Sequence, residues 1–227
     1  MINFNVLDAF VQVELEMEEG EKNLQGILFR DNSDFGIIIP RITGIEEGLK
    51  LITIKSPLYP REFEFTPTKD FMAIENEYLM FLPIEEIECN GELKHKTRVY
   101  SKEELRSIRY VMSNHFGYLS NVEYYYFLTY MNGLTKGIVT NTMFRDLGYT
   151  QEEDGQNGYN FVSVLDASLY DGSPLIATNQ NNIFPNPKEL IQGIFIKNPE
   201  YIPELENMPN TGIVVGADFV FDLIKKL

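Results

Sequence analysis

Few side chains in this sequence carry the usual chemistry of catalysis, and their spacing matches no catalytic motif. The 227 residues include two histidines and one cysteine, His95, His115 and Cys89. These three cannot supply the four ligands of a structural zinc site, and they lack Cys-x-x-Cys or His-x₃-His spacing. Phosphate loops, dinucleotide-binding glycine motifs, nucleophile elbows and His-Glu-x-x-His are missing too. We therefore expect no metal and no cofactor, assign no catalytic residue, and lean away from an enzyme. An enzyme built on dispersed carboxylates and His115 stays open.

Basic residues gather in one part of an otherwise acidic chain. Eight of the 19 lysines and arginines lie within 94–145, although the net charge is −15. Lys102, Arg106 and Arg109 have the spacing of one helix face. Arginine offers paired donors that suit phosphate or carboxylate, and nearby tyrosines can stack on bases or anchor an interface. The predicted partner- or phosphate-binding residues are Arg98, Lys102, Arg106, Arg109, Tyr126 and Tyr130. A solvated helix face, paired with the chain's own acids and backed by core tyrosines, is the alternative.

Acidic residues alternate with apolar ones near the start of the chain. Glu14 and Glu16 are two apart, so they share one face of a strand, and Glu18 continues the series. Such a row of carboxylates could cover a basic partner or imitate a phosphate backbone. We predict an acidic partner-binding face at Glu14, Glu16 and Glu18. A solvated sheet face that discourages aggregation would have the same pattern.

The first 90 residues have the patterning of strands. Phe10–Met17 alternates apolar and polar residues, and Leu49–Lys55 and Phe63–Phe65 continue the pattern. A hairpin is expected across 26–39, because the turn-favouring residues Asp31-Asn-Ser-Asp34 separate two apolar runs. Five or six short strands predict a small barrel or twisted antiparallel sheet over residues 1–90.

Beyond residue 90 the local signals favour helices. Ser101-Lys-Glu-Glu104 and Ser120-Asn-Val-Glu123 match capping boxes, which predicts a helical hairpin over 101–132. Short helices are also expected at 141–147, after Asn186-Pro187 and at 217–227, with strands at 161–165, 175–178, 193–197 and 212–215. The expected fold class is α+β, with a β-rich N-terminal half, 1–90, and a mixed C-terminal half, 91–227. The two halves could also form one compact unit.

Composition limits the compartment and the class of partner. No apolar window of about 18 residues exists, and the N-terminus lacks the basic region of a signal peptide. One cysteine excludes an intramolecular disulfide, which is typical of the cytoplasm. The many Asn, Ile, Tyr and Phe residues suit an AT-rich genome, so we expect a bacterial cell, with or without an infecting bacteriophage. The acidity disfavours membrane binding and favours basic partners.

These observations predict an acidic cytosolic protein that acts through protein–protein interaction, as an inhibitor, immunity protein or assembly factor does. One alternative is a nucleic-acid or phospholigand binder that uses the basic helix face 98–109. Another is a structural component of a virion. The expected partner is a protein, nucleic acid or nucleotide is a second possibility, and the oligomeric state stays open.

Overall fold

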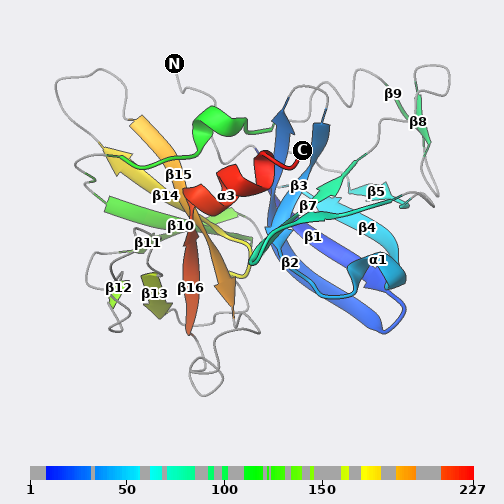
Figure 1. The fold of residues 1–227 in the computed structure, drawn as a ribbon, viewed down its shortest axis with the longest axis horizontal. Helices are drawn as coiled ribbons and strands as arrows, with labels where there is room; N and C mark the ends of the chain where they lie inside the picture. Colours follow the sequence, from blue (N-terminus) through cyan, green and yellow to red (C-terminus); the bar gives the residue numbers. More distant parts are fainter. Residues whose placement is uncertain are drawn as a thin grey trace. The chain divides into compact units, whose positions relative to one another are not determined.

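The chain forms two compact units, residues 1–112 with Leu227 and residues 113–226. The computed structural model describes residues 9–31, 34–56, 62–67, 71–84, 92–94, 99–101, 110–119, 122, 124–130, 134–139, 144–145, 160–163, 170–179, 188–197 and 211–227. Each unit is built on one antiparallel sheet, and the strands of both can be followed in Figure 1. None of the helices within these ranges is long and apolar enough to cross a membrane.

The sheet of the first unit has seven strands in the order β5-β4-β1-β2-β3-β7-β6. A four-residue helix, α1 (Ile45–Gly48), links β3 to β4, and β8 (Glu92–Lys94) pairs separately with β9 (Val99–Ser101). The strands are β1 (Phe10–Met17), β2 (Gly20–Asp31), β3 (Asp34–Pro40), β4 (Leu49–Lys55), β5 (Phe63–Phe65), β6 (Ile74–Glu75) and β7 (Leu79–Pro83).

Strand β1 shows how this sheet divides core from solvent. Val13 and Leu15 are fully buried, whereas the alternate residues Glu14 and Glu16 are partly exposed. Strand β3 is apolar on both faces, since Ile37 to Ile39 are all buried. This sheet therefore has a half-solvated part and a fully buried part.

Val111 forms an isolated parallel bridge with Phe29, near the C-terminal end of β2. Its N–H donates to the carbonyl of Leu28 at 2.9 Å, and its carbonyl accepts from the N–H of Arg30 at 3.0 Å. Nearby, the guanidinium of Arg30 lies 4.8 Å from the ring centre of Phe35 and 5.0 Å from that of Tyr110. The segment at 110–111 is thus part of the first unit's fold.

The second unit also has a seven-stranded sheet, in the order β11-β10-β14-β15-β16-β13-β12. A 3₁₀ turn, η2 (Ser113–His115), precedes it and the helix α3 (Ala217–Ile224) follows it. The strands are β10 (Tyr124–Tyr130), β11 (Leu134–Val139), β12 (Phe144–Arg145), β13 (Asn160–Ser163), β14 (Pro174–Asn179), β15 (Lys188–Lys197) and β16 (Thr211–Gly216).

Aromatic rings form the centre of the second core. The ring centres of Phe127 and Phe195 are 5.5 Å apart, and that of Tyr170 lies 5.9 Å from the first and 6.4 Å from the second. Phe127 and Phe195 are almost completely buried together with Leu175 and Val214. Tilted and edge-on rings at these distances are favourable in protein cores.

Both sheets share one arrangement of strands. Three consecutive strands lie in the middle, β1-β2-β3 in the first unit and β14-β15-β16 in the second. A strand pair flanks each side, β4–β5 and β6–β7 in the first unit, β10–β11 and β12–β13 in the second. In both units the first strand of the first pair joins the start of the middle three, and the second strand of the second pair joins their end.

The expected α+β class with a helical hairpin is wrong, because the described residues are mostly in strands. Tyr124–Tyr130, which lies within the helix predicted over 122–131, is strand β10, paired with both β11 and β14. Residues 102–109 of the first predicted helix lie outside the described ranges. The helix expected after Pro187 is also wrong, since Lys188–Lys197 is strand β15, and Phe144–Arg145 is strand β12 rather than helix. In β10 and β15 ladder partners on both sides outweigh the local helix signals.

Helix α3 begins beside a tyrosine hydroxyl. The Oη of Tyr118 donates to Oδ2 of Asp218 at 2.9 Å, and burial followed by this contact raises the pKa of Tyr118 to about 12. The native state therefore favours the protonated phenol, so its contribution to stability is complete below pH 10 and is lost as the pH rises towards 12. We expect this loss to stay below about 1 kcal/mol, because Tyr118 is half exposed and solvent screens the contact.

Urea denaturation of the wild type and of Tyr118→Phe at pH 8 and near pH 11 measures this contribution. The gap between the two free energies of unfolding should narrow at the higher pH, because other titrating groups are common to both proteins. An unchanged gap would show that the phenol titrates alike in the folded and unfolded chains.

Candidate functional site

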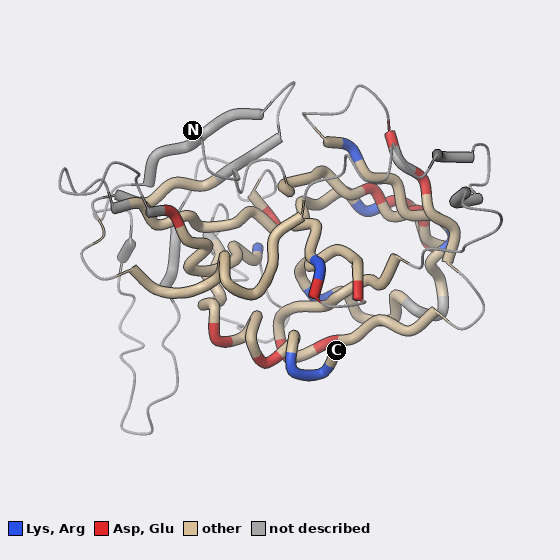
Figure 2. Tube along the Cα trace, turned by 90° about the horizontal axis from the view of Figure 1, so that it is seen from above, with Lys and Arg blue, Asp and Glu red and all other residues tan. Residues whose placement is uncertain are grey.

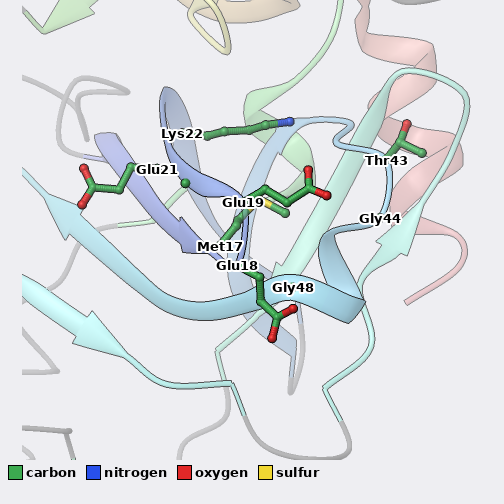
Figure 3. A pocket seen from close by; sticks show the side chains of 9 residues that line it. Met17, Glu18, Glu19, Glu21, Lys22, Thr43, Gly44 and Gly48 are labelled. Carbon is green, nitrogen blue, oxygen red and sulfur yellow. The ribbon is translucent and has the colours of Figure 1, made fainter.

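A pocket of about 400 Å³ lies in the first unit, between the β1–β2 turn and the segment Thr43–Gly48 (Figure 3). Its two walls are 21 or more residues apart along the chain, and they meet because β1 pairs with both β2 and β4. The lining residues are Met17, Glu18, Glu19, Gly20, Glu21, Lys22, Thr43, Gly44 and Gly48.

Backbone geometry fixes the two walls. The β1–β4 register shifts between Glu16 and Met17, an irregularity that turns the end of β1. Beyond it the N–H of Glu18 donates to the carbonyl of Gly48 at 2.9 Å, which ties one wall to the other. Gly20 and Gly44 have φ of 137° and 73°, values that side chains other than glycine rarely adopt. The pocket is therefore built from two turns joined by a main-chain hydrogen bond.

Two of the four charged lining side chains point into the pocket. Figure 3 shows Glu19 and Lys22 extending towards the Thr43 side, with the thioether of Met17 beside Glu19, whereas Glu18 and Glu21 point away. Within the described part of the chain, the side chains of Glu19 and Lys22 have no hydrogen bond or ion pair. A carboxylate and an ammonium that are both unpaired among the described residues thus face one cavity.

The predicted acidic face is split between an internal ion pair and this pocket. Lys55 Nζ lies 2.5 Å from Oε1 of Glu14 and 3.4 Å from Oε1 of Glu62. Its hydrogen bond to Glu14 is the main cause that raises the pKa of Lys55. Glu16 lies on the same face of β1 as Glu14, and Glu18 is exposed at the pocket rim. Figure 2 marks the described acidic and basic residues along the chain trace. A partner-binding role for Glu14, Glu16 and Glu18 stays a prediction.

Most of the predicted basic face lies outside the described residues, namely Arg98, Lys102, Arg106 and Arg109. Tyr126 is described and fully buried, and its hydroxyl donates to Oε1 of Glu189 at 3.0 Å, so its ring is closed to a ligand. Tyr130 belongs to β10, but its side chain lies outside the description. The face as a whole stays a prediction.

The candidate groups for catalysis are scattered. His115 ends the 3₁₀ turn at the start of the second unit and is partly exposed, while His95 and Cys89 lie outside the described residues. The described ranges contain no group of three or more His, Cys, Asp or Glu that could hold a metal ion. Within the described ranges His115 therefore belongs to no such metal-binding group.

A tight loop precedes β14 in the second unit. Oδ1 of Asp171 accepts the N–H of Lys197 at 2.9 Å, and the N–H of Gly172 donates to the carbonyl of Phe195 at 2.9 Å. Ser173 is fully buried, and its carbonyl accepts the N–H of Phe195 at 2.8 Å. The loop is therefore fastened to β15 by three hydrogen bonds, and it keeps its serine away from solvent.

The sequence indicated some of these features and missed others. It placed a turn at Asp171-Gly172, as observed, and a charged turn at 18–23, where the structure has a turn at Glu18 and Glu19 and strand β2 from Gly20 onward. It treated Glu19 and Lys22 only as members of that charged turn. Gly20 and Gly44 were the available signal, because glycine often marks a left-handed turn. Their proximity depends on the pairing of β1 with β4, which no local pattern reveals.

The fold is similar to that of chymotrypsin-like proteases. A thermostable serine protease from an extremophilic microorganism superposes with a TM-score of 0.52 at 7% identity, over 95% of this chain and 94% of that one. A catalytically inactive tobacco etch virus protease complexed with substrate gives 0.44 at 12% identity, over 93% and 78%. A human astrovirus serine protease gives 0.43 at 11% identity, over 95% and 91%.

At these identities the likeness establishes the fold alone, on the evidence of the superposition with a TM-score of 0.52. No protein-family model matches the sequence, and no curated protein matches it significantly. The comparison nevertheless overturns the expected function of an acidic inhibitor, immunity protein or assembly factor. The nucleic-acid-binding and virion-component alternatives are corrected with it, because the structure that superposes with a TM-score of 0.52 is a serine protease.

Proposed function

We propose that this protein hydrolyses peptide bonds and that its protein partner is its substrate. The observation that carries the proposal is the superposition of 95% of the chain on 94% of a serine protease, which includes both seven-stranded units. A fold can host more than one activity, so the proposal needs a direct test of chemistry.

Because the chain has two histidines, two substitutions are enough to test for a catalytic base. In proteases of this fold a histidine takes the proton of the nucleophile and a carboxylate orients the imidazole. The chain order there is histidine, aspartate, serine. This chain offers only His95 and His115 as the base, and both come before β10, the first strand of the second unit. Ser173 is a poor nucleophile where it lies, because a fully buried hydroxyl cannot reach a substrate carbonyl.

The net charge of the chain predicts which substrates it prefers. At −15 the chain attracts basic polypeptides and repels acidic ones, most strongly at low salt. A lysine- and arginine-rich protein such as protamine should therefore be cut faster than an acidic one such as casein.

Cleavage by the purified full-length chain tests the function. We expect wild type to cut protamine, and either His95→Ala or His115→Ala to lower kcat/KM at least about 100-fold, as loss of a general base does. The other histidine variant is the matched control and should keep wild-type activity. Cys89→Ser separates a thiol nucleophile from a hydroxyl one.

Two results would overturn the proposal. One is no cleavage of either protein by a folded wild-type chain after overnight incubation. The other is cleavage that survives both histidine substitutions, since it would belong to a contaminant or to chemistry without an imidazole.

A further inference from the structure

We infer that the pocket in the first unit binds a zwitterion of amino-acid size, a ligand with a free α-ammonium and a free α-carboxylate. The groups that would recognise it are the carboxylate of Glu19 for the ammonium and the ammonium of Lys22 for the carboxylate. Both side chains line the pocket and extend into it (Figure 3). Peptide hydrolysis is not required for this binding, so the inference is independent of the proposed function.

Charge selects this class of ligand. Glu19 and Lys22 are opposite in sign, and neither has an ion-pair partner in the described part of the chain. Glu18 and Glu21 share the rim but point away, so the inward-facing charges balance (Figure 3). A simple cation or anion would pair with one group and leave the other unsatisfied, whereas a zwitterion pairs with both through charge-assisted hydrogen bonds.

Size and apolar surface support the same class. A volume of about 400 Å³ is in the range of small-molecule sites and exceeds what an inorganic ion needs. The thioether of Met17 faces the pocket, and methionine adapts its shape to apolar groups. An aliphatic side chain on the zwitterion would lie against Met17, so leucine is a suitable probe.

The walls are prepared for a ligand by the backbone. The hydrogen bond from the N–H of Glu18 to the carbonyl of Gly48 holds the β1–β2 turn against the end of α1. The left-handed turns at Gly20 and Gly44 give each wall its direction. Binding would therefore order only the ends of Glu19 and Lys22, which limits its entropic cost.

Calorimetric titration of the full chain with L-leucine tests the inference. We expect saturable binding with a Kd of about 1 mM, from two charge-assisted hydrogen bonds together with the apolar contact of leucine with Met17. Leucinamide lacks the carboxylate and N-acetyl-L-leucine lacks the ammonium, so each should bind at least about tenfold more weakly.

Three glutamine variants locate the site. Glu19→Gln and Lys22→Gln should each weaken L-leucine binding about tenfold, while the matched control Glu21→Gln should change it less than about twofold. All three positions are exposed, Glu19 in the β1–β2 turn and Glu21 and Lys22 in the first residues of β2, and thermal denaturation should confirm that each variant is folded.

The inference is overturned if a folded wild-type chain shows no saturable binding up to about 20 mM L-leucine, well above the expected Kd. It is also overturned if leucinamide and N-acetyl-L-leucine bind as tightly as L-leucine does. The same holds if Glu21→Gln weakens L-leucine binding as much as Glu19→Gln and Lys22→Gln do. Both results would mean that the charges act as a general field rather than as two specific contacts.

Discussion

A Gly36→Ala variant is expected to destabilise the first unit by about 4 kcal/mol or more, which is large against typical domain stabilities. A Cβ on Gly36 would lie 2.2 Å from the carbonyl oxygen of Leu82 and 2.5 Å from the ring of Phe81. The oxygen belongs to the β3–β7 ladder, where Ile37 is paired with Leu82, so it cannot move without opening that ladder. Phe81 is buried and in contact with Phe29, with ring centres 6.2 Å apart.

Gly48→Ala is the matched control. Its Cβ would have the backbone nitrogen of Glu18 as nearest neighbour at 3.6 Å, an ordinary contact, so the change should cost less than about 1 kcal/mol. Urea denaturation measures the free energy of unfolding of both variants. Hydrogen exchange of the backbone amides across residues 24–40 shows whether the loss of stability lies in the first unit. Equal stabilities of the two variants would mean that β3 and β7 are not packed as described.

A Phe195→Ala variant should destabilise the second unit by about 3–5 kcal/mol, the usual cost of removing a buried aromatic side chain. The ring of Phe195 is fully buried and touches both Phe127 and Tyr170. Its backbone also holds Gly172 and Ser173, so loss of the ring should loosen the loop 170–173 before the whole unit unfolds.

Phe195→Leu keeps most of the volume and is expected to cost less than about 1.5 kcal/mol. Urea denaturation measures both variants, and hydrogen exchange at 170–175 reports on the loop. If the alanine variant unfolds like wild type, then the three rings do not form the centre of this core.

The strands of the first half could be predicted because their pattern is local. Phe10–Met17, Leu49–Lys55 and Phe63–Phe65 have the predicted bounds, since alternation directly reports a sheet with one wet face. The run Tyr124–Tyr130 has no such alternation, and a short apolar run fits a buried helix as well as a buried strand. Its aromatic content and its length of seven residues favour a strand, but two capping-box sequences suggested otherwise.

The pocket could not be predicted, although its residues were noticed. Its walls approach one another only through the β1–β4 register, in which Met17 is opposite Leu49 after a shift. A shift of one residue would turn Met17 to the other face, and nothing in the local sequence sets it. The same holds for the predicted acidic face, where the partner of Glu14 is Lys55, 41 residues further along the chain.

The shared strand arrangement implies that the two units are circular permutants, with opposite consequences during synthesis on the ribosome. The first unit's three middle strands come first, so a low-contact-order nucleus is complete once Pro40 has emerged, and the flanking pairs can add to it. In the second unit the flanking pairs are synthesised before the middle strands to which they bind. Strand β10 pairs with β14, and β13 pairs with β16. The pair β12–β13 therefore keeps an exposed edge until Gly216 has been made, which favours a greater dependence of this half on chaperones.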